Sequence, residues 1–102
     1  MDFIDIRQIL LTPEVIEAVK QYGVNLKGKG FKMDKPSRGF VAPLNRLLEM
    51  EDAFDSDIDL PPMEVRFSIV FNNVKYYSVL DGRHRFAMSI IKGLATVPVK
   101  IV

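Results

Sequence analysis

The chain has 102 residues, of which 48% are apolar and 26% charged, and its formal net charge is +1. This length supports one hydrophobic core, so a single domain over residues 1–102 is expected, and so weak a net charge does not by itself indicate a nucleic-acid-binding protein. The absence of cysteine excludes disulfides and thiolate chemistry and favours the cytoplasm, and no apolar run is long enough to cross a membrane.

The N-terminal part predicts a short strand followed by a helix. Residues 3–6 alternate imperfectly between apolar and acidic types, which favours a strand or an extended segment. Thr12, Pro13 and Glu14 are typical of a helix start, because threonine caps free N–H groups, proline fits the first turn and glutamate opposes the positive dipole end. The helix is expected over residues 13–22, with Gly23 as its stop. Its apolar stripe consists of Val15, Ile16, Val19 and Tyr22.

A basic, glycine-rich loop is predicted over residues 24–41. Its segment from Lys27 to Arg38 either closes over a phosphate, contacts a nucleic-acid backbone or stays a solvated surface loop. Phe31 and Phe40 flank this segment, and each either anchors the loop to the core or stacks on a base.

A second helix is predicted to begin at Pro43, and an acidic segment follows it from Glu49 to Asp59. The alternating oxygen ligands from Asp55 to Asp59 are compatible with Mg²⁺ or Ca²⁺. A solvated acidic turn is the better interpretation, because Leu60 stands where a calcium-binding EF-hand loop needs glycine.

The C-terminal part predicts a hairpin, a helix and a last strand. Residues 64–71 alternate, with Val65, Phe67, Ile69 and Phe71 on one side, which indicates a half-buried strand. Asn72-Asn73 tolerates the positive φ of a hairpin turn, and residues 74–80 form the returning strand. A helix is expected from about Arg83 to Lys92, ended by Gly93, and a terminal strand over residues 97–102.

The joint between the second hairpin strand and this helix carries the candidate chemistry. Arg83, His84 and Arg85 place cations at the positive end of a helix dipole, which is unfavourable by about 0.3–1 kcal/mol each. A bound anion would reverse the sign, since it would meet free first-turn N–H groups and guanidinium donors together. The missing Cβ of Gly82 would let a ligand oxygen approach the backbone. Alternatively, Asp81 and other acids neutralise the arginines, and His84 fills a polar niche.

Pro61-Pro62-Met63-Glu64-Val65 stands before the hairpin, Asp81-Gly82-Arg83-His84-Arg85 follows it, and a terminal strand comes last. In this order, residues 61–102 resemble the core of the ParB/sulfiredoxin superfamily. The resemblance implies an α+β fold in which helices pack on a small mixed sheet. In that family the turn and its helix hold nucleotide phosphates, those of CTP in ParB and of ATP or ADP in sulfiredoxins and free-serine kinases. By position, Gly82, His84 and Arg85 would contact phosphate, with Arg83 beside them.

A weaker likeness and three departures qualify this resemblance. Lys35-Pro36-Ser37-Arg38 is similar to the Gln-Pro-x-Arg box of ParB-like domains, which makes Lys35 and Arg38 candidates for contact with phosphate or nucleic acid. Sulfiredoxin activity is excluded, because Arg83 stands where that chemistry needs cysteine. The helix-turn-helix domain of ParB is missing from this chain, so partition is not expected of it alone. A kinase of this fold needs a general base, for which the candidate carboxylates are Glu49, Glu51 and Glu64.

The leading function is therefore binding of a nucleotide, CTP or ATP, or of another phosphate group, at residues 81–85. Mg²⁺-assisted hydrolysis or phosphoryl transfer would extend it, with Glu64 and His84 as weak catalytic candidates and no resident metal site. One alternative is an accessory protein that grips DNA or RNA backbone phosphates, or a ParB-like nuclease. Another is a non-catalytic module that binds a protein partner.

Overall fold

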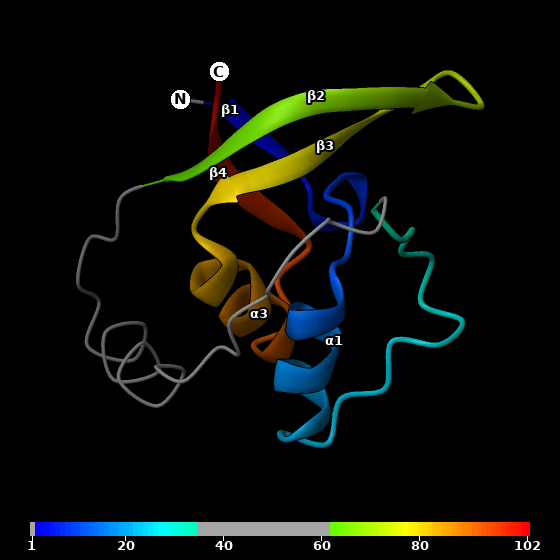
Figure 1. Cartoon of the computed structure of the whole chain (residues 1–102), viewed down its shortest axis with the longest axis vertical. Helices are drawn as coiled ribbons and strands as arrows, with labels where there is room; N and C mark the ends of the chain where they lie inside the picture. Colours follow the sequence, from blue (N-terminus) through cyan, green and yellow to red (C-terminus); the bar gives the residue numbers. More distant parts are fainter. Residues whose placement is uncertain (1, 35–61) are drawn as a thin grey trace.

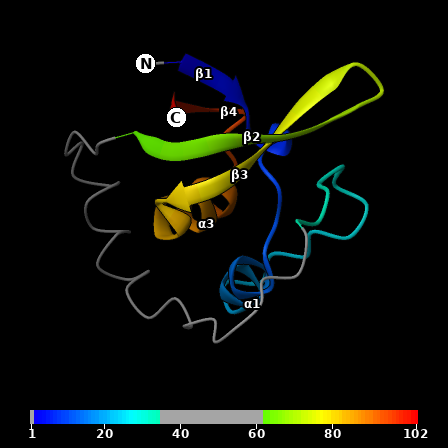
Figure 2. The same ribbon diagram turned by 45° about the horizontal axis from the view of Figure 1, so that its top comes forward.

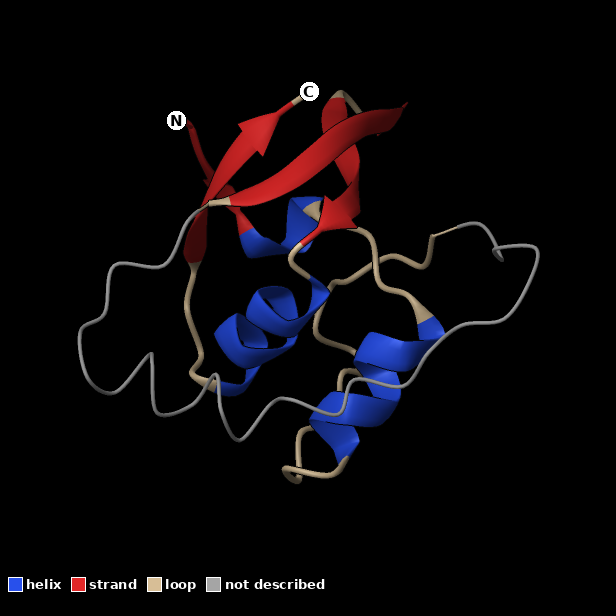
Figure 3. Ribbon diagram, turned by 60° about the vertical axis from the view of Figure 1, so that its left-hand side comes forward, coloured by secondary structure: helices blue, strands red, loops and turns tan. Residues whose placement is uncertain are grey.

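The computed structural model describes residues 2–34 and 62–102, which form one mixed sheet with helices on one of its faces (Figures 1 and 3). The elements in chain order are β1 (Asp2–Asp5), the 3-10 turn η1 (Ile6–Gln8), α1 (Pro13–Lys20), β2 (Met63–Phe71), β3 (Val74–Asp81), α3 (Arg83–Ile91) and β4 (Thr96–Ile101). The strand order is β1-β4-β2-β3, and only the β2–β4 pair is parallel. The predicted α+β class, with helices packed on a small mixed sheet, is confirmed.

The core lies between the sheet and the two helices. Val15 and Val19 of the predicted stripe are at most 1% exposed, and Phe86 and Ala87 of α3 are fully buried against them. Phe31 packs on this core with its ring centroid 6.5 Å from that of Phe86. Phe31 therefore anchors its loop to the core, which was one of its two predicted roles.

Helix α1 begins at the predicted residue, but its cap differs from the prediction. Thr12 has the extended backbone of an N-cap residue, yet its side chain makes no capping hydrogen bond. The helix ends at Lys20, and Gly23 follows with a φ of +78°, as expected of a stop signal. Within the described ranges, neither helix has the length and apolar character needed to cross a membrane.

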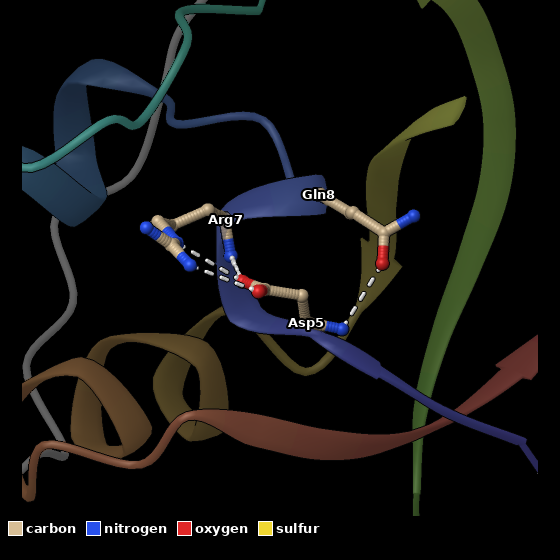
Figure 4. A network of polar contacts seen from close by, with 3 residues as sticks. All are labelled: Asp5, Arg7 and Gln8. Carbon is tan, nitrogen blue, oxygen red and sulfur yellow. Dashed lines mark hydrogen bonds and ion pairs between the residues drawn. The ribbon is translucent and has the colours of Figure 1, made fainter. Parts of the chain in front are cut away.

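A network at η1 fastens the N-terminal strand to the hairpin (Figure 4). The Asp5 carboxylate accepts hydrogen bonds from the backbone N–H of Arg7 at 2.8 Å and from its guanidinium at 3.1 and 3.2 Å. The Gln8 side chain accepts from the Asp5 N–H and donates to the carbonyl of Lys75. Leu10 N–H then donates to the carbonyl of Tyr77 at 2.9 Å, so this segment covers the outer edge of β3.

The burial predicted for β2 is wrong beyond Val65. Val65 is fully buried, but Phe67, Ile69 and Phe71 are 48–51% exposed. Two facts explain the difference. Strand β2 pairs with β4 only over Met63–Val65, and a bulge between Phe67 and Ile69 breaks its register with β3. Asn72 and Asn73, with φ of 50° and 63°, close the predicted hairpin, which projects beyond the sheet (Figures 1 and 2).

Candidate functional site

The turn from β3 into α3 has the predicted strand-turn-helix form. Strand β3 ends at Asp81, Gly82 is the N-cap residue with a φ of +106°, and α3 begins at Arg83. The carbonyl of Gly82 accepts the N–H of Phe86 at 2.9 Å, which closes the first turn. No side chain caps this turn. The helix N-terminus therefore keeps the electrostatic character that favours an anion.

The structure gives Gly82 a different role from the predicted one. A Cβ at this position would lie 2.8 Å from Cγ of Met63 and 3.3 Å from its Cα. Met63 is 2% exposed and begins β2. The space that a side chain would occupy is thus filled by the neighbouring strand, and glycine is needed there for packing and for its left-handed backbone.

Arg83 is paired with a carboxylate that the sequence did not single out. Its Nη1 lies 2.9 Å from Oε1 of Glu14, in the first turn of α1. The Glu14 side chain is 8% exposed and that of Arg83 is 37% exposed. The fold therefore neutralises one of the predicted cations, as the alternative interpretation of the turn expected, although the acid involved is Glu14.

Glu14 stays ionised in this setting. Burial opposes its charge, but the hydrogen bonds from its own backbone N–H and from Arg83 outweigh burial and lower its pKa below the ordinary value of 4.5. The Thr12 hydroxyl adds to this lowering of the pKa, and both it and the second carboxylate oxygen, Oε2, are buried. No sequence signal could have marked Glu14 as part of the site, since it stands 69 residues from Arg83.

Arg85 turns to the other side of the joint. Its Nη1 donates to the carbonyl of Pro62, just before β2, at 3.3 Å. Its Nε is buried and has no acceptor. An unmatched buried donor costs about 1–3 kcal/mol, so Arg85 keeps a donor that a ligand oxygen would satisfy.

The other candidates lie at different distances from the turn. His84 is half-buried in the first turn of α3. Glu64 is the register partner of the exposed Asp81, which places it on the strand beside the turn. Among the described residues, no cluster of three acidic or histidine side chains could hold a metal ion. The remaining predictions fall outside the described residues: Lys35, Arg38, Phe40, the helix from Pro43, Glu49, Glu51 and the acidic segment to Asp59.

The fold is similar to a solved structure of a nucleotide complex. That structure is the C-terminally truncated chromosome-partitioning protein ParB from Caulobacter crescentus with CTP-γ-S. The TM-score is 0.55 and the identity 20%, over 99% of this chain and 43% of that one, so this chain spans less than half of its length. No protein-family model matches the chain, and no curated protein matches its sequence. The ParB-like fold predicted from the turn is confirmed.

The packing role of Gly82 predicts the effect of adding one methyl group. Gly82→Ala should destabilise the fold by about 2–3 kcal/mol, because it adds contact with Met63 to the strain of a left-handed residue. Gly93→Ala is the matched control, since Gly93 has a φ of +73° and open space around its Cβ position. It should cost only about 1 kcal/mol. Urea unfolding of both variants measures the difference, and equal losses would contradict the packing role.

The Glu14–Arg83 pair predicts a pH-dependent stability. Because the folded pKa of Glu14 is lowered, its contribution is complete above the ordinary value of 4.5 and is lost as the pH falls through the folded pKa. Glu14→Gln should therefore cost about 1–2 kcal/mol at neutral pH and progressively less in acid. Chemical unfolding across this pH range tests it. Glu17→Gln, on the same helix but exposed, is the control and should change little; a loss for Glu14→Gln that does not vary with pH would refute the prediction.

Proposed function

We propose that the chain is a ParB-like domain that binds a nucleotide or another phosphate group at the turn from Asp81 to Arg85. The observation that carries this proposal is the buried, unmatched Nε of Arg85, one turn into a helix without a side-chain cap. A phosphate oxygen would satisfy this donor and would also meet the positive end of α3. Among the described residues, no side chain accepts a hydrogen bond from the Arg85 Nε or caps the N-terminus of α3.

Arg85 and Arg83 would have different roles in this site. Arg85 and His84 would contact the phosphate, together with backbone N–H groups of the first turn. Arg83, whose charge Glu14 compensates at 2.9 Å, would instead hold α1 beside the turn. Gly82 would keep α3 close to β2. Arg85 would thereby stay near Pro62, just before the start of β2.

A nucleoside triphosphate with Mg²⁺ is the ligand that this arrangement suits best. The ParB structure of the same fold holds CTP-γ-S, so CTP and ATP are the first candidates. Mg²⁺ is usually held by substrate phosphates with one or two carboxylates, and Glu14 is a carboxylate beside the turn. Hydrolysis or phosphoryl transfer extends the proposal, with Glu64 and His84 as candidate proton-transfer groups.

The test is calorimetric titration with CTP, ATP and their diphosphates, with and without Mg²⁺. We expect one nucleotide to bind, and Arg85→Ala to weaken it at least about tenfold, because a charge-assisted hydrogen bond contributes that much. Lys20→Ala removes the same charge at the far, exposed end of α1 and should leave binding unchanged. Released phosphate, measured in the same samples, reports hydrolysis.

Two results would count against the nucleotide site. The first is no binding across the panel, and the second is equal weakening by Arg85→Ala and Lys20→Ala. Steeply salt-dependent binding to any duplex would instead support the nucleic-acid alternative. Circular dichroism of each variant separates a loss of binding from a loss of fold.

A further inference from the structure

The hairpin of β2 and β3 leaves the sheet as a two-stranded ribbon (Figures 1 and 2). Strand β4 accompanies β2 only as far as Val65, whose carbonyl accepts the N–H of Val102 at 2.9 Å. Beyond this point β2 continues for six residues, from Arg66 to Phe71, paired with β3 alone. This ribbon is distinct from the turn at residues 81–85, which lies at the other end of the same strands.

The two edges of the ribbon differ. The outer edge of β3 is covered, because Gln8 and Leu10 donate hydrogen bonds to the carbonyls of Lys75 and Tyr77. The edge of β2 is open, since no strand of the described chain pairs with it from Arg66 to Phe71. An open edge presents backbone donors and acceptors to which another extended segment can pair.

Apolar side chains gather around this open edge. Five large apolar residues of the ribbon are 40–51% exposed: Phe67, Ile69, Val70, Phe71 and Val74. The bulge after Phe67 reverses the alternation, so these residues are shared between both faces. Single exposed apolar residues are ordinary, but this density beside an open edge is typical of an interaction surface.

The charge of the ribbon selects the partner. Between Glu64 and Asp81 the only charged residues are Arg66 and Lys75. Lys32 adds a third cation, with its Nζ 4.3 Å from the ring centroid of Phe71. The apolar surface is therefore bordered by positive charge, which complements an acidic segment and repels a basic one.

We propose that the open edge of β2, from Arg66 to Phe71, binds an extended segment of a partner protein in which apolar and acidic residues alternate. The segment adds to the sheet as a strand beside β2, with its apolar residues on the face of Phe67 and Val70 and its carboxylates on the opposite face, near Arg66 and Lys32. A second copy of the chain fits less well, because the pairing of two identical edges would bring their cations together.

The test uses a fluorescein-labelled peptide of alternating glutamate and valine, with a peptide of alternating lysine and valine as its charge-reversed control. Fluorescence anisotropy should show binding of the acidic peptide alone. Phe67→Thr combined with Val70→Thr should weaken it at least about tenfold, through lost apolar contact at half-exposed, strand-compatible positions on one face of the ribbon. Arg66→Glu combined with Lys32→Glu should reverse the preference between the two peptides, because both cations lie on the face of the ribbon that meets the carboxylates.

Phe3→Thr is the matched control, because Phe3 is a 65% exposed apolar residue on β1, the edge strand opposite β3 in the sheet. It should leave peptide binding unchanged. Hydrogen exchange of the amides from Arg66 to Phe71 should slow when the acidic peptide is bound. Equal binding of both peptides, protection at β1 in place of β2, or self-association of the chain abolished by the Phe67 and Val70 changes would each overturn the proposal.

Discussion

The close approach of Gly82 to Met63 is the constraint on which the arrangement of the site depends. Met63 begins β2, is buried, and stands in register with Val99 of β4, so it ties two strands of the sheet together. A glycine with positive φ lets the chain leave β3 directly against this residue. The first turn of α3 is thereby held beside the first residues of β2. That proximity is what places the Arg85 guanidinium within reach of the carbonyl of Pro62.

The two arginines of the turn have different surroundings because they stand two positions apart on a helix. Side chains at such a spacing do not face the same way. Arg83 reaches Glu14 on α1, whereas Arg85 reaches the backbone before β2. Counting cations along the sequence therefore overstates the charge left for an anion, since one guanidinium is already compensated. An anion at the turn would therefore be held by the Arg85 guanidinium and the uncapped N-terminus of α3, and not by a general excess of positive charge.

Features that depend on residues adjacent in the sequence could be predicted, and features that depend on contacts between residues far apart in the sequence could not. Helix α1, the Asn72-Asn73 turn and the start of α3 follow from local signals, and the structure has them where the sequence indicates. The exposure of β2 does not, because it is set by where β4 ends and by a bulge. Likewise, the position of the turn could be predicted from the sequence. The ion pair between Glu14 and Arg83 and the contact of the Gly82 Cβ position with Met63 could not. The contribution of Lys35 and Arg38 stays a prediction.

Strands β2 and β3 carry the candidate nucleotide turn at one end and the projecting ribbon at the other, yet the two ends are differently supported. At the turn, Val65 and Val99 are fully buried and the strands lie within a four-stranded sheet. Beyond Val65 only two strands remain, and an isolated two-stranded ribbon has little stability of its own. A third strand added along β2 would order this ribbon up to the point where the core begins.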